Sequence, residues 1–234
     1  MKQNKLLTLY KKIIPEYSRL MLPMALVWNL LAYYGGKLTG SLFTVHDVTS
    51  SFDALIPFVP ASVITYVLAY PFWVVNYSLA ARRDEKFAAR FFCADFLTRL
   101  VCFVIFTLFP TTAVRPEVSG SGLGEWIISI VYFMDTPLDL FPSIHCIASL
   151  LSYAAVAGNK KIPAAYRIFS LVFAAAVSIS AVLTKQHVHI DIIGGTAVML
   201  ICWMIAGIPK LSETYLGSIK KLQSKLRSPD DLTN

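Results

Sequence analysis

The feature that most constrains this chain is a series of long, nearly charge-free apolar stretches spread along its 234 residues. A helix needs about 20 mostly apolar residues to cross the hydrocarbon core of a membrane. Stretches of about this length occupy residues 20–36, 54–79, 91–110, 140–158, 162–183 and 188–208. Charged residues make up only 15% of the chain, whereas soluble domains average about 25%. The sequence therefore predicts an all-α, polytopic membrane protein with six transmembrane helices.

A further apolar run, residues 123–134, is too short to cross. We expect a short interfacial helix there, with Trp126 at the depth of the lipid headgroups. Within the third long stretch, Asp95 and Arg99 stand four residues apart, so they are expected to pair on one face of a helix. The cysteines have no metal-ligand spacing and are expected to be small core residues without disulfides: Cys93, Cys102, Cys146 and Cys202.

The basic residues assign the two sides of the membrane. All but three of the 21 Lys and Arg residues lie in or next to alternate loops and the two ends of the chain. Because Lys- and Arg-rich loops stay in the cytoplasm, both termini are expected to be cytoplasmic. The net charge of +7 therefore reports topology, and nucleic acid is not an expected partner. The expected divisions are a basic N-terminus (1–19), a six-helix domain (20–210) and a basic tail (211–234).

The three exceptions, Lys37, Arg115 and Lys185, are expected on the outer side. Lys37 follows two glycines at the end of a span and is most simply an interfacial anchor. The other two belong to polar clusters that this topology brings to one membrane depth. These clusters are Arg115-Pro116, the run Pro142-Ser143-Ile144-His145, and the run from Lys185 to Asp191.

Together the clusters contain the groups that phosphoryl transfer needs. His187 and Asp191 are four residues apart, so on a helix the carboxylate can hold one ring nitrogen and leave the other free as a nucleophile. His145 can supply the complementary acid. Arg115 and Lys185 are cations suited to phosphate, and the helix N-terminus at Ser143 adds N–H groups and a hydroxyl.

The residues around His187 also allow a metal-site interpretation. His187, His189 and Asp191 alternate and would face one way on a strand, as metal ligands do, but the unbroken apolar run that follows favours a helix. On a helix His189 faces elsewhere, which favours packing or a lipid contact. Asp135 and Asp139 are expected to be solvated loop charges.

In these residues the chain resembles the type 2 phosphatidic acid phosphatase superfamily, whose motifs are K-x6-R-P, P-S-G-H and S-R-x5-H-x3-D. The resemblance covers about residues 109–195. The matching residues are Arg115-Pro116 in the first motif, Pro142, Ser143 and His145 in the second (with Ile144 for glycine), and Ser180, His187 and Asp191 in the third.

The chain also departs from the family pattern. Leu108 and Ala181 stand where the family has lysine and arginine. Lys185 is a candidate replacement for one of these cations. The run Thr-Lys-Gln-His at residues 184–187 is similar to a divergent branch that includes inositol phosphorylceramide synthase-like proteins. These departures leave open the substrate and the choice between hydrolysis and transfer.

The resemblance implies a role for each site residue. His187 would attack phosphorus and form a phosphohistidine, with Asp191 orienting it. His145 would protonate the leaving group and then activate water. Arg115, Ser143 and Lys185 would hold the phosphoryl oxygens. No metal or other cofactor is required in this scheme.

The sequence as a whole thus predicts a metal-independent lipid phosphatase of the cell membrane, multi-pass, with its site on the extracytoplasmic side. Phosphatidic acid, phosphatidylglycerol phosphate and polyprenyl diphosphate are the substrate types considered, and the partners are this phosphorylated lipid and the bilayer. Two alternatives remain open: a lipid phosphotransferase with an alcohol acceptor, and a non-catalytic membrane transporter or scaffold.

Overall fold

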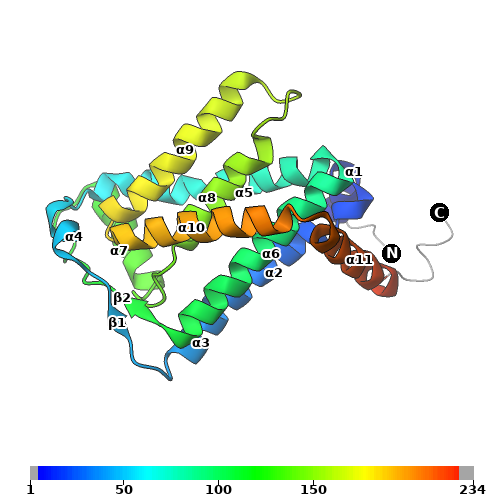
Figure 1. Cartoon of the computed structure of the whole chain (residues 1–234). Coiled ribbons are helices and arrows are strands. Elements are labelled where there is room, and N and C mark those ends of the chain that lie inside the picture. Colours follow the sequence, from blue (N-terminus) through cyan, green and yellow to red (C-terminus); the bar gives the residue numbers. More distant parts are fainter. Residues whose placement is uncertain (1–4, 227–234) are drawn as a thin grey trace.

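Helices make up nearly all the regular structure of residues 5–226, the part of the chain that the computed structural model describes (Figure 1). The expected all-α fold is therefore confirmed for this part. Residues 1–4 of the expected basic N-terminus and residues 227–234 of the expected basic tail lie outside the described residues. The two strands are two residues long and parallel, β1 (His46–Asp47) beside β2 (Thr111–Thr112). They join the segment before α4 to the segment after α6.

The helices follow one another along the chain with short connections. In order they are α1 (Lys5–Ile13), η1 (Glu16–Ser18), α2 (Met21–Leu30), η2 (Leu31–Gly35), α3 (Gly36–Gly40), α4 (Ser51–Leu55), η3 (Pro60–Ser62), α5 (Val63–Arg83), α6 (Glu85–Leu108), α7 (Leu123–Met134), α8 (Ile144–Val156), α9 (Ala164–Leu183), α10 (His189–Ala206) and α11 (Pro209–Leu226).

Four helical segments of the described chain are long and apolar enough to cross a membrane. They are η3 with α5, then α6, α9 and α10. Several such helices in one chain are the mark of a multi-pass membrane protein. Inside α6 the expected polar pair is present, because an Arg99 nitrogen lies 3.1 Å from Asp95 Oδ1. The Tyr77 hydroxyl donates to the same oxygen at 2.7 Å, so a third group shares this buried pair.

The first and second expected spans have other bounds than the sequence prediction. The first is helical from Met21 to Gly40, beyond its expected end at residue 36, because the π-helical η2 joins α2 to α3. The second begins late, at Pro60, after a stretch interrupted by Pro57.

The fourth expected span, residues 140–158, is only partly helical. Its helix, α8, has 13 residues, which rise about 20 Å, less than the hydrocarbon thickness of about 30 Å. Pro142 and the cap at Ser143 delay its start, and Gly158, with a φ of 68°, follows its end. The count of six spans thus stays a prediction.

Two groups of elements lie at opposite ends of the bundle (Figure 1). At one end are α1 and α11, which carry many of the basic residues. At the other end α4, α7 and the two strands lie together. The bounds of α7 are the expected residues 123–134, and Trp126 on it is 63% exposed. The candidate site residues belong to this second end.

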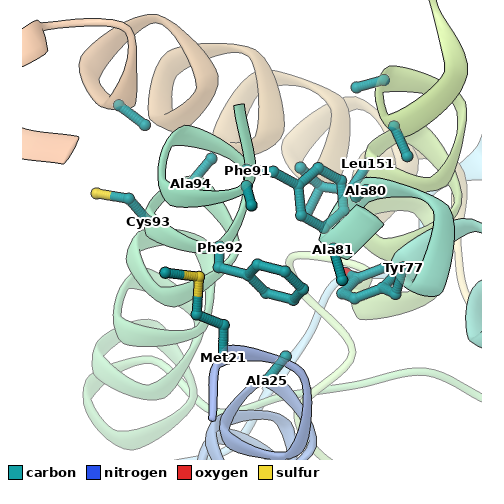
Figure 2. Packing of buried hydrophobic residues seen from close by; sticks show 14 of the residues in the cluster. Met21, Ala25, Tyr77, Ala80, Ala81, Phe91, Phe92, Cys93, Ala94 and Leu151 are labelled. Atoms are coloured by element: carbon teal, nitrogen blue, oxygen red, sulfur yellow. The ribbon is translucent and has the colours of Figure 1, made fainter. Parts of the chain in front are cut away.

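A hydrophobic core fixes the relative positions of the long helices (Figure 2). The side chains of α6 lie at its centre, with alanines that let neighbouring backbones approach closely. All four cysteines are free and buried, as expected. The residues that Figure 2 labels are Met21, Ala25, Tyr77, Ala80, Ala81, Phe91, Phe92, Cys93, Ala94 and Leu151.

Candidate active site

The candidate site forms where the segments before α8 and α10 meet. The Ser143 backbone N–H donates to the Asp191 carbonyl at 3.0 Å, which joins the two helix beginnings. Two glycines of α10 allow this approach. A side chain at Gly195 would bring its Cβ to 2.8 Å from the Ser143 carbonyl, and one at Gly194 would collide with the Phe141 ring. Hence the second and third sequence clusters lie side by side.

His187 and Asp191 form the expected pair. His187 Nδ1 lies 3.1 Å from Asp191 Oδ2, and the same oxygen accepts from the Val188 N–H at 2.9 Å. The geometry differs from the expected one, because His187 precedes α10 and the pair forms at the helix N-terminus. Asp191 is fully buried. The carboxylate therefore holds both the ring and the backbone, and no described residue binds Nε2 of His187.

His145 occupies the first turn of α8 inside an aromatic enclosure. Its ring stacks on Tyr66 with centroids 4.2 Å apart and lies 5.1 Å from the Trp73 ring. The Tyr66 hydroxyl is 3.3 Å from His145 Nδ1. His145 Nε2 is buried and has no hydrogen-bond partner among the described residues. The ring centres of His145 and His187 are 5.9 Å apart, so one phosphoester group can touch both.

A cavity of about 540 Å³ opens at the two histidines. Its walls come from α2 and η2, α5, α7, and the segments that carry His145, Gln186 and His187. Most of the lining is apolar or aromatic, with a few polar groups, which is typical of a site for an amphiphilic ligand. Its aromatic residues are Tyr33, Tyr34, Tyr66, Tyr70, Trp73, Phe106 and Trp126.

Arg115 joins the first sequence cluster to the third. One guanidinium nitrogen donates to the Gln186 side-chain oxygen at 2.6 Å, and another donates to the Asp135 backbone carbonyl. The guanidinium also lies over the Tyr132 ring, 4.7 Å from its centroid. Gln186, next to His187 in sequence, is buried and has an amide nitrogen without a partner in the described chain. The sequence argument did not single out Gln186.

Ser143 and Lys185 reach the site region, but other groups already engage them. The Ser143 hydroxyl oxygen caps α8 by accepting from the Cys146 N–H at 3.2 Å. The Lys185 ammonium donates to the carbonyls of Asp53 and Ile56 at 2.8 and 2.6 Å. Lys185 itself has a φ of 52°, in the left-handed region that side chains rarely adopt. It therefore fastens α4 to the segment before His187.

Asp53 is a buried neighbour of the site that local sequence patterns did not reveal. Its carboxylate accepts from the His189 N–H at 2.8 Å and lies 3.0 Å from His189 Nδ1. Burial raises the pKa of Asp53, but hydrogen bonds from His189 and Ser50 lower it more, to about 2. His189 thus makes a polar packing contact, away from His187. Among the described residues, no group of three His, Cys, Asp or Glu side chains is placed to hold a metal.

His187 also lines a second, smaller cavity of about 300 Å³. Asp53, Ile56, Pro116 and Lys185 line it together with His187. His187 therefore borders two cavities, a larger one with apolar and aromatic walls and a smaller one beside the α4 segment.

The expectation of solvation is wrong for Asp139, and the Asp135 side chain, 26% exposed, is only partly solvated. Asp139 is only 5% exposed and neither of its carboxylate oxygens has a partner in the described chain. Burial raises the pKa of Asp139. The positive charge of Lys37 lowers it and the negative charge of Asp135 raises it, so that the pKa is about 7. The Asp135 carboxylate binds Lys37 at 2.6 Å. Charge spacing in the sequence gave no signal for the burial of Asp139 or for the Asp135–Lys37 pair.

Comparisons with known proteins assign no family. A scan of protein-family models, a search of curated proteins and a search of solved structures each returned no match. The functional argument therefore rests on the site geometry and on the motif resemblance.

Proposed function

We propose that this chain is a multi-pass membrane enzyme that hydrolyses a lipid phosphomonoester or diphosphate through a phosphohistidine on His187. One observation carries the proposal. His187 is fixed through Nδ1 by the buried Asp191, while the ring faces a largely aromatic cavity shared with His145. A fixed imidazole with one free nitrogen is an activated nucleophile, and an adjacent second imidazole is a general acid and base.

The proposed reaction has two steps. His187 Nε2 forms a bond to phosphorus while the bond to the leaving oxygen breaks, and His145 gives that oxygen a proton. Water then attacks phosphorus, His145 takes its proton, and the N–P bond breaks to release phosphate. Asp191 stabilises the charge that develops on the His187 ring. Arg115, and the Ser143 and Lys185 groups if they exchange their present partners, would hold the phosphoryl oxygens.

The proposed topology has six spans, with α2–α3 as the first and α8, extended by residues 140–143, as the fourth. Both termini lie in the cytoplasm and the site lies at the extracytoplasmic face. The concentration of basic residues near α1 and α11, at the end opposite α7, supports this arrangement.

The test is phosphate release by the purified full-length protein in detergent. Phosphatidic acid, phosphatidylglycerol phosphate and a polyprenyl diphosphate form the substrate panel. We expect turnover of at least one, retained in EDTA. Absence of phosphate release from the whole panel would contradict hydrolysis and favour the transporter or scaffold interpretation. Activity lost in EDTA and restored by zinc or magnesium would contradict the metal-free scheme.

Transfer to an alcohol is the second candidate, and the smaller cavity beside His187 favours it. An acceptor could reach the phosphohistidine from that side while the lipid occupies the aromatic cavity. Adding glycerol or inositol to the assay separates the two functions. A new phosphomonoester of the added alcohol, formed in place of free phosphate, would identify a transferase.

A further inference from the structure

Lys37 extends from α3, in the first expected span, toward the candidate site. Its ammonium donates to Asp135 Oδ1 at 2.6 Å, to the Tyr33 hydroxyl at 2.7 Å and to the Thr136 carbonyl at 3.2 Å. Gly36 and Gly40 allow α3 to lie against the last turns of α6, because a side chain at either would collide with Phe106. Close packing thus fixes the helix from which Lys37 extends. A lysine that served only as a membrane anchor would point its ammonium toward lipid headgroups and water, whereas Lys37 directs it to three protein groups.

Arg115 approaches the same carboxylate from the other side. Its Nη2 lies 3.8 Å from Asp135 Oδ2, and it also donates to the Asp135 backbone and to Gln186. The Tyr33 hydroxyl binds Asp135 Oδ1 as well. One carboxylate therefore lies between two cations and beside a phenol. Asp135, Tyr33, Gln186 and His187 all line the larger cavity.

The position of the Asp135 carboxylate is unfavourable without those cations. It caps the C-terminal end of α7, where the helix dipole disfavours negative charge. Its side chain is 26% exposed, so its contacts with the cations do not enclose it completely. The site formed by Lys37, Tyr33 and Arg115 is therefore an anion site that an anion of the protein itself occupies.

We propose that Lys37, Tyr33 and Arg115 together bind the phosphate of the substrate, and that Asp135 holds this place until the substrate displaces it. The proposal rests on the proposed function and adds two residues and a competing internal anion to it. The chemistry fits, because two cations with one carboxylate keep a net positive charge, whereas a phosphate dianion neutralises them and offers more acceptor oxygens. The phosphate would then lie beside Gln186 and within reach of His187.

The test compares Lys37→Met and Asp135→Asn with wild type in the full-length protein. The measurements are the KM for the lipid phosphate and the inhibition constant of inorganic phosphate. We expect Lys37→Met to raise both about 10-fold, since it loses a charged partner of the phosphate. Asp135→Asn should lower both about 3- to 10-fold, because it removes the competing anion. Lys37→Arg should stay within about 3-fold of wild type, which guards against a folding defect in the methionine variant.

Lys220→Met is the matched control. Lys220 also pairs with a carboxylate, 2.8 Å from Glu85 Oε1, but at an exposed position on α11. It should leave both constants within about 2-fold of wild type. If Asp135→Asn raises KM, Asp135 only positions Arg115 and the proposal is wrong. If Lys37→Met leaves the inhibition by phosphate unchanged, Lys37 is only a structural link, and the proposal is equally wrong.

A binding measurement keeps this test separate from the proposed catalysis. Thermal stabilisation by inorganic phosphate needs no turnover. We expect it to be larger in Asp135→Asn and smaller in Lys37→Met than in wild type. That ranking would support the anion site even if no lipid in the panel were hydrolysed, whereas equal stabilisation in all three proteins would refute it.

Discussion

His187 and His189 are two residues apart, and each holds an aspartate through Nδ1, yet their surroundings differ. His187 is 8% exposed and lines two cavities. His189 is 31% exposed at its side chain and lines neither, and it packs edge-on against Phe52. Asp191 lies four residues after its histidine, in the first turn of α10, whereas Asp53 comes from α4, far from His189 in sequence. A His–Asp pair does not by itself make an active site. The imidazole also needs a cavity beside it, where a substrate can reach the ring nitrogen that the aspartate leaves free.

The largest expected difference between the two pairs is in turnover. His187→Ala should reduce kcat by a factor of about 10⁴ or more, because the proposed nucleophile is lost. His189→Ala should keep kcat within about 3-fold of wild type. Phosphate release by the two purified variants measures this, and acid-labile labelling with radioactive substrate should be absent only in the His187 variant. Equal losses in both variants would contradict the assignment of the nucleophile.

A smaller difference is expected between the two aspartates. Asp191→Asn should lower kcat by about 100-fold, because the ring loses the charge that orients and stabilises it. Asp53→Asn should change kcat less than about 3-fold, since it acts on α4 and not on the reacting ring. The measurement is kcat and KM for the same lipid substrate, with thermal unfolding as a check on folding. A larger loss in Asp53→Asn would move the active pair to His189.

The smallest expected effects are on the free energy of unfolding. Its pH dependence should differ between variants of Asp53 and Asp139. The depressed pKa of Asp53, about 2, stabilises the fold above its unfolded pKa near 4, and this contribution is lost as pH falls toward 2. Asp53→Asn should therefore lower the free energy of unfolding by about 1–2 kcal/mol at pH 7. The loss should shrink in acid.

Asp139 should behave in the opposite way. Its raised pKa, about 7, makes the folded state lose stability as pH rises from about 4 to 7, because the unfolded chain ionises first. Asp139→Asn should raise the free energy of unfolding by about 1–3 kcal/mol at pH 8 and by little at pH 4. Denaturation of Asp139→Asn at pH 4 and pH 8 tests this, and denaturation of Asp53→Asn at pH 7 and near pH 2 tests the opposite trend. A gain for Asp139→Asn that is equal at both values would show that the carboxyl does not titrate in this range.

Contacts within short sequence distances were predictable. The Asp95–Arg99 and His187–Asp191 pairs are each four residues apart, and both form. The bounds of α7 follow from local hydrophobicity, as does the presence of the long helices α6, α9 and α10. The start of α8 was placed too early, because the extended segment at Phe141-Pro142 is as apolar as the helix that follows. Hydrophobicity alone does not separate the two.

Contacts across long sequence distances were not predictable. Lys185 was expected at phosphate, but it binds carbonyls of the α4 segment, 132 and 129 residues away. Lys37 was expected to be an interfacial anchor, but its partner Asp135 lies 98 residues away. Asp139 was expected in solvent and is buried. No periodicity connects such residues, because they meet only once the helices have packed.

The sequence by itself determined that the chain is a set of apolar helices carrying three polar clusters, because hydropathy and local spacing are properties of neighbouring residues. The tertiary structure decided which polar groups meet. It brought His145 and His187 to one cavity, turned Lys185 toward α4, and placed Asp135 between Lys37 and Arg115. Those outcomes depend on how closely the backbones approach at Gly36, Gly40, Gly194 and Gly195, and close approach is a property of the packed bundle.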